Sequence, residues 1–267
     1  MPGRKPPQTE EGWFVSHLVL SINRRDASQD NADLSSLAEQ SASVLEPASE
    51  KQQIDLGRIV SSKGDLMTMM FTETMEEVEA FQRDLLNSSL GPYLEREYTF
   101  LSVTELSFYR STEEKVEDYL DDENVEPGTE TYQQREQELK QRFKKYEDMR
   151  LHPKIPDMDY LTFYPMKKRR NVKQNWYQLP ADKRGKLMQA HGATGRKYAG
   201  DIKQIITSCV GLDEWEWGVT LYGDDARDFK RLIYEMRFDE VSAVYSDFGP
   251  FYTGLRIDPE ALPDYVS

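Results

Sequence analysis

The 267-residue chain is poor in the residues that crosslink proteins and build metal clusters, since it has one cysteine, Cys209, and three histidines. A lone cysteine excludes an intrachain disulfide, and this usage favours a reducing, cytoplasmic compartment. No histidines and cysteines are spaced as in a zinc site, and the P-loop, GxSxG and GxGxxG patterns are missing from the sequence. Because Cys209 lies in an apolar run, we expect it to be a buried packing residue.

The N-terminal segment MPGRKPPQTEEG has no apolar run, so it predicts neither a signal peptide nor a transmembrane helix. We expect residues 1–11 to form a disordered tail and the protein not to insert into membranes. The composition of the whole chain is globular, with 38% hydrophobic and 11% aromatic residues. A chain of this length can bury a core without crosslinks.

Positive charge is scarce and unevenly spread: 34 Lys and Arg residues face 48 Asp and Glu, for a net charge of −14. This deficit excludes nucleic acid as a general partner, because binding its phosphate backbone needs a broad basic face. Yet segment 164–203 holds eleven basic residues and two acidic ones, with four in succession from Lys167 to Arg170. Such a cationic island is typical either of a site for a small anionic ligand or of a solvated loop.

The hydrophobic pattern predicts one order of elements twice: strand, short acidic turn, amphipathic helix, strand. The two copies lie about 150 residues apart. An additional strand at 13–22 and a helix at 33–45 precede the first copy. The copies comprise 65–72, 72–86 and 97–109 in the first half, and 215–222, 224–237 and 241–254 in the second.

This repeat predicts an α+β fold made of two ferredoxin-like halves per subunit, residues 12–111 and 147–267, of the dimeric α+β-barrel type. The two sheets could pack face to face or close into a barrel. Residues 112–146 read as an acidic connector, part helix and part loop, and the segment YQQREQELKQRFKKYEDMR predicts an exposed helix.

His191 is the histidine with a suggestive setting. The segment ADKRGKLMQAHGATGRKYAG predicts a helix that ends at His191, with Gly192 as its C-terminal stop. A histidine in a last helical turn can simply stabilise the helix dipole. It can also ligate a metal through one ring nitrogen while the other nitrogen bonds a carboxylate or carbonyl behind it.

Three strings carry a family resemblance: YPMKKRR, NWY..P...R..LM..HG..GR.Y.G...Q.I and YEMRFDE.SA.Y..FG.F. They resemble the chlorite dismutase-like haem protein family, and within it the coproheme decarboxylases. The match is strong over residues 147–255, weaker over 13–110, and lost in 24–60 and 112–146. The resemblance implies two ferredoxin-like halves, the second binding haem, in subunits that assemble as a homopentamer.

The resemblance also assigns roles to residues of this chain. It implies a proximal haem ligand, a catalytic tyrosine, a lysine on the reactive propionate, two distal-side pocket residues and three propionate-binding residues. Taken singly, each residue has an ordinary structural explanation, and the joint match in order is what favours the roles. The proximal ligand is His191, the catalytic tyrosine is Tyr164, and the lysine on the reactive propionate is Lys168. The distal-side pocket residues are Met166 and Gln204, and the propionate-binding residues are Arg150, Arg237 and Ser242.

The implied reaction converts iron coproporphyrin III (coproheme) to haem b with hydrogen peroxide, through a tyrosyl radical on Tyr164 and oxidative decarboxylation of two propionates. Arginines supply paired donors for carboxylates, and Lys168 a mobile proton. Chlorite dismutases have a distal arginine where this chain has Gln204, so we predict little chlorite degradation. Two alternatives stay open: a non-catalytic haem-binding or haem-sensing protein, and a non-haem barrel that uses KKRR for another anion.

Overall fold

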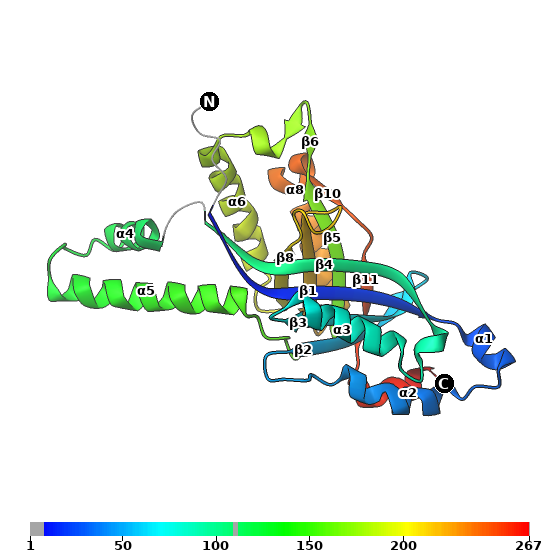
Figure 1. Cartoon of the computed structure of the whole chain (residues 1–267). Coiled ribbons are helices and arrows are strands. Elements are labelled where there is room, and N and C mark those ends of the chain that lie inside the picture. Colours follow the sequence, from blue (N-terminus) through cyan, green and yellow to red (C-terminus); the bar gives the residue numbers. More distant parts are fainter. Residues whose placement is uncertain (1–7, 109–111, 267) are drawn as a thin grey trace.

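The computed structural model describes residues 8–108 and 112–266 (Figure 1). Each half contains a strand, an amphipathic helix and a further strand in the order that the repeat predicts. The first half contains β1 (Gln8–Ile22), α1 (Arg24–Gln29), α2 (Leu34–Ser41), β2 (Gln53–Ser61), β3 (Gly64–Thr72), α3 (Met75–Leu86) and β4 (Leu94–Phe108). The second contains β5 (Tyr160–Lys168), β6 (Arg170–Asn171), β7 (Gln174–Asn175), α6 (Ala181–Arg196), β8 (Ile202–Ser208), β9 (Trp217–Gly223), α7 (Ala226–Met236), α8 (Glu240–Tyr245), β10 (Ser246–Phe248), β11 (Tyr252–Arg256) and α9 (Leu262–Val266).

Each half has ferredoxin-like strand order. The first half runs β2–β3–β1–β4, and the second runs β11–β5–β9–β8, with β10 extending β11 along the same edge of β5. The halves join at both edges, because β11 pairs with β2 and β4 pairs with β8. The sheet therefore closes into a barrel, which decides between the two packings that the sequence left open.

The internal repeat is confirmed. Helices α3 and α7 begin at Met75 and Ala226, which are 151 residues apart. Each helix follows its strand through a polar cap: Thr74 forms a capping box at α3, and Asp225 accepts a hydrogen bond at α7. Local capping signals therefore set the helix starts in both halves.

Three hydrophobic clusters divide the core by layer. The barrel interior is filled from all eight ring strands, with Phe71, Phe163 and Tyr222 among its largest buried side chains. The outer face of the first half is covered by α2, α3 and α9. The outer face of the second half packs against α7 through a third cluster that includes Tyr164. Cys209 is fully buried in the barrel interior, as predicted.

Helices α4 (Thr112–Asp122) and α5 (Glu130–Leu151) form an arm that projects from the barrel (Figure 1). The helix predicted within 132–150 is confirmed as part of α5. The arm has its own small core, to which Val116, Leu120 and Leu139 contribute buried side chains. Across residues 8–108 and 112–266, no helix combines the length and apolar character that crossing a membrane requires.

Several local predictions need correction. Residues 8–11 of the predicted tail belong to β1, where Gln8 pairs with Phe108 of β4, because backbone pairing extends a strand regardless of polar side chains; residues 1–7 lie outside the described part. Segment 241–245 is helical rather than extended, because Asp239 caps α8. Strands β2 and β8 had no predicted counterpart.

Candidate active site

Strand β5 supplies three of the predicted site residues on one face. Tyr164, Met166 and Lys168 alternate with inward-facing residues and therefore point to the outer side of the barrel. Tyr164 is 6% exposed, and its ring stacks on Phe251 with 4.5 Å between ring centroids. Burial raises the pKa of Tyr164 above its ordinary value, and Arg237 only partly opposes this. The phenol is therefore neutral in the folded protein.

Lys168 is a buried cation, only 7% exposed. Its Nζ donates a hydrogen bond to Ser246 Oγ at 3.1 Å and lies 4.8 Å from the ring centroid of Trp176. Burial lowers the pKa of Lys168 to about 8, against the attraction of the Asp239 and Glu216 carboxylates. This side chain can therefore gain or lose a proton close to neutral pH.

Glu216 is a site residue that the sequence predictions missed. It is 5% exposed, and its Oε2 accepts the backbone N–H of Lys168 at 2.7 Å. Its own backbone N–H donates to the carbonyl of Met166 at 3.0 Å, and its Oε1 lies 3.9 Å from Arg170 Nη1. The signal was available in WEWG, where a carboxylate stands between two tryptophans at the start of a buried strand.

His191 lies in α6, and its Nδ1 is 3.1 Å from Asp239 Oδ2. Asp239 also caps α8 by accepting from the Ser242 backbone N–H and hydroxyl, the latter at 3.0 Å. Burial lowers the pKa of His191 despite the carboxylate, which favours a neutral ring. With Nδ1 engaged, Nε2 is the nitrogen available to a ligand. A carboxylate therefore lies behind the imidazole, as the metal-ligand alternative requires.

The helix around His191 differs from the prediction. Helix α6 continues through Gly192 to Arg196, because Gly192 keeps helical geometry and only Gly64, Gly128 and Gly211 have positive φ among the described glycines. His191 therefore does not occupy a last turn. The helix-dipole explanation for this histidine loses its basis.

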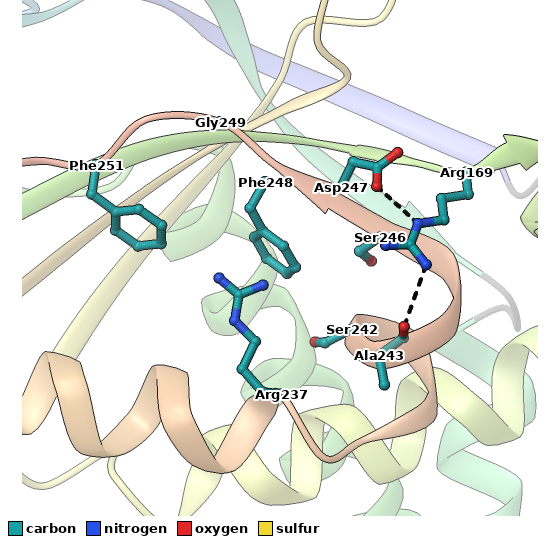
Figure 2. A pocket seen from close by; sticks show the side chains of 9 residues that line it. All are labelled: Arg169, Arg237, Ser242, Ala243, Ser246, Asp247, Phe248, Gly249 and Phe251. Atoms are coloured by element: carbon teal, nitrogen blue, oxygen red, sulfur yellow. Dashed lines mark hydrogen bonds and ion pairs between the residues drawn. The ribbon is translucent and has the colours of Figure 1, made fainter.

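A pocket of about 450 Å³ opens between α7, α8 and β10 (Figure 2). Arg237 caps the C-terminus of α7, and its guanidinium lies 4.1 Å from the ring centroid of Phe248. Ser242 is 5% exposed and Ser246 is 2% exposed. The lining consists of Arg169, Arg237, Ser242, Ala243, Ser246, Asp247, Phe248, Gly249 and Phe251.

The pocket wall connects directly to the other site residues. Ser246 binds Lys168, and Phe251 stacks on Tyr164. Ser242 shares the Asp239 carboxylate with His191. Arg237 and Ser242 line the pocket themselves, and Met166 pairs with Phe248 in the sheet. Two of the eight predicted residues thus line the cavity, and four more are joined to its wall by a side-chain contact, a strand pairing or the shared Asp239 carboxylate.

The other two predicted residues lie outside this group. Gln204 is an exposed residue of β8, separated from β5 by β9, and its neighbours Ile202 and Ile206 share the outer face with Tyr164. Arg150 stands in the last turn of α5, beside β1 and β4. Neither belongs to the nine residues that line the pocket. Their predicted contacts with a ligand stay predictions.

The closed barrel of two ferredoxin-like halves, with an arginine- and serine-lined pocket beside a histidine–carboxylate pair, defines a dimeric α+β-barrel protein with a candidate site in its second half. The chain belongs to the chlorite dismutase family, whose model matches residues 34–257. This finding confirms the resemblance drawn from the sequence strings.

Two relatives illustrate the family around this chain. It is 34% identical to a coproheme decarboxylase from Staphylococcus saprophyticus over 97% of both chains. It is 38% identical, over 98% of its own length, to a Halobacterium salinarum protein whose name proposes that it binds heme. The chain covers 51% of that protein, and between 38% and 46% of three further haloarchaeal relatives. It thus spans about half the length, or less, of these relatives.

Solved structures agree with this placement. A heme-binding protein from Thermus thermophilus superposes with a TM-score of 0.76 at 35% identity, covering 98% of this chain and 97% of the other. A variant of the chlorite dismutase from Candidatus Nitrospira defluvii gives a TM-score of 0.71 at 16% identity, covering 97% of both chains. At that identity the second likeness shows the fold alone.

Proposed function

We propose that the chain is a coproheme decarboxylase, which converts iron coproporphyrin III to haem b with hydrogen peroxide. The observation that carries this proposal is that the buried Tyr164, the buried Lys168 and the His191–Asp239 pair each contact the wall of one pocket lined by arginines and serines. The similarity to the Staphylococcus saprophyticus coproheme decarboxylase over nearly the full length of both chains supports it.

The donor set suits an iron porphyrin with several propionates. A neutral imidazole with Nδ1 bound to Asp239 can offer Nε2 to the iron. Arg237 and the serine hydroxyls of Ser242 and Ser246 provide donors for carboxylates. The Phe248 and Phe251 rings, beside Tyr164, provide aromatic surface for a flat macrocycle. When bound, the iron porphyrin supplies the oxidising chemistry with peroxide, and the protein supplies orientation and electrostatics.

The reaction at each propionate balances with one peroxide and one proton. The propionate and hydrogen peroxide, with that proton, become a vinyl group, carbon dioxide and two waters. Tyr164 would give up an electron and its phenolic proton, then regain both from the propionate β-carbon. The second electron would leave the substrate as carbon dioxide is released, so that the two electrons together reduce one peroxide. Because burial keeps the phenol neutral, the electron and the proton would leave together. Lys168 would hold the reacting carboxylate and supply the proton that is consumed.

Haem binding without turnover is the second candidate, because the names of the longer haloarchaeal relatives propose only that function. The pairing of a buried tyrosine with a buried lysine on one strand face favours the enzyme, since a passive binder would need neither. We also propose by resemblance that the protein acts as a cytoplasmic homopentamer. Sedimentation equilibrium of the purified protein tests that assembly, and a monomeric mass would contradict it.

Reconstitution with ferric coproporphyrin III tests the function. Wild type should give a Soret band, which His191→Ala weakens, and peroxide addition should remove two carboxyl groups in succession by mass spectrometry. A Soret band with no loss of carboxyl mass would favour the non-catalytic candidate. No binding of the iron porphyrin would favour the non-haem alternative.

A further inference from the structure

Arg169, the third of the four successive basic residues, lines the pocket. It follows Lys168 directly, and its side chain is 26% exposed. Its Nε donates to Asp247 Oδ1 at 2.8 Å, and its Nη1 donates to the carbonyl of Val244 at 3.1 Å. Figure 2 shows Arg169 and Arg237 reaching the cavity from opposite sides. The pocket therefore has a cation at each of two edges.

The partner of Arg169 is the carboxylate of Asp247, and a carboxylate is unusual in the lining of a pocket for an anion. Asp247 lines the same cavity, and its side chain is 44% exposed. An ion pair between two partly exposed side chains contributes little to stability. A ligand carboxylate that enters the cavity can therefore replace Asp247 on the guanidinium at little cost. The carbonyls at the end of α8 would keep the Arg169 fork aimed during the exchange.

We infer that Arg169 is a substrate-binding residue, which anchors one porphyrin propionate by exchanging its Asp247 partner for the substrate carboxylate. The identity of the ligand rests on the proposed function. In this arrangement Asp247 acts as a stand-in for the propionate and competes with it. Arg169 and Arg237 then hold carboxylates at two edges of the macrocycle, with Ser242 and Ser246 between them (Figure 2).

The competition gives the two partners opposite effects on affinity. In a Soret titration with ferric coproporphyrin III, Arg169→Gln should raise Kd by about 10- to 100-fold, the usual effect of losing a charge-assisted hydrogen bond. Asp247→Asn should lower Kd roughly threefold or more, because it removes a competing carboxylate and a negative charge. Lys173→Gln, in the exposed turn between β6 and β7, makes the same charge change as Arg169→Gln outside the pocket and should leave Kd within about twofold.

If the ion pair had only a structural role, breaking it from either side would weaken binding, and Kd would rise in both single variants. A Kd that rises in both Arg169→Gln and Asp247→Asn overturns the inference. In the double variant, the gain from Asp247→Asn should shrink to the part that comes from the lost negative charge, because no guanidinium is left to release. Circular dichroism and thermal midpoints confirm that each variant is folded.

The outcome separates this inference from the proposed reaction. Opposite Kd shifts without loss of carboxyl mass would support the anchor and contradict the decarboxylase. Normal decarboxylation by wild type with parallel Kd shifts would contradict the anchor alone. Failure of wild type to bind ferric coproporphyrin III would overturn both.

Discussion

The two halves of the barrel place different residues on equivalent outer positions. Leu18 pairs with Thr68 of β3, and Tyr164 pairs with Val219 of β9. Thr68 and Val219 each lie seven residues before the helix that follows, α3 at Met75 and α7 at Ala226. Leu18 and Tyr164 are therefore register equivalents, and so are the next two outward-facing residues of each strand.

The three positions differ in chemistry rather than in backbone. The first half has Leu18, Leu20 and Ile22, all buried in an apolar cluster under α2, α3 and α9. The second half has Tyr164, Met166 and Lys168 at the same positions. The buried apolar side chains of one half thus correspond in register to a redox-capable phenol and a titratable amine in the other. The comparison indicates that these positions stabilise the barrel in the first half and give up some stability for the candidate site in the second.

Shortening a buried apolar side chain of the first half should have the largest effect on stability. Leu18 is fully buried, so Leu18→Ala should destabilise the protein by about 2–5 kcal/mol through lost burial and a residual cavity. Chemical denaturation measures this difference. At the equivalent position of the other half, Tyr164→Phe removes only the hydroxyl and should cost much less. Equal losses would contradict the division of labour between the halves.

Removing the buried amine should instead stabilise the protein. Lys168 has its pKa lowered from 10.5 to about 8, so the folded state binds fewer protons than the unfolded chain between those values. The stability of wild type should therefore rise as the pH increases from about 8 to 10.5. Lys168→Met should add on the order of 2–3 kcal/mol near neutral pH, and this advantage should shrink across that window. A constant advantage at all pH values would refute the assigned cause.

The same titration should appear in catalysis with the opposite sense. In the proposed reaction the protonated Lys168 would attract the propionate, so kcat/KM for coproheme should fall above about pH 8. The fall should approach tenfold, or about 1.4 kcal/mol, for each further pH unit. The charged and titratable groups around this amine are Asp239, Glu216 and His191. Lys168→Met should lack the fall, and a wild-type profile that stays level through this range would contradict the assigned role.

The smallest expected effect concerns chlorite. Gln204 is uncharged and exposed on β8, so the reconstituted protein should degrade little or no chlorite. Oxygen evolution on adding chlorite measures this directly. Turnover at rates typical of a chlorite dismutase would show that Gln204 does not make the distinction we assign to it.

Much of this arrangement could be read from the sequence because its signals are local. Periodic apolar residues and polar caps predict the α3 and α7 helices, and the repeat predicts the two ferredoxin-like halves. The sequence left barrel closure as one of two alternatives, because the β11–β2 and β4–β8 pairings that decide it join residues far apart in the chain. The contacts of Glu216 and Asp239 could not be predicted for the same reason. Their partners, Lys168 and His191, each lie 48 residues away in the chain.

The central claim is that Tyr164 carries the chemistry of the second half. The most direct test compares Tyr164→Phe with Tyr160→Phe, a tyrosine in the same cluster of β5, after reconstitution with ferric coproporphyrin III and titration with peroxide. We predict that Tyr164→Phe binds the porphyrin yet leaves all four carboxyl groups intact by mass spectrometry, while Tyr160→Phe yields haem b. Full conversion by Tyr164→Phe would contradict the account.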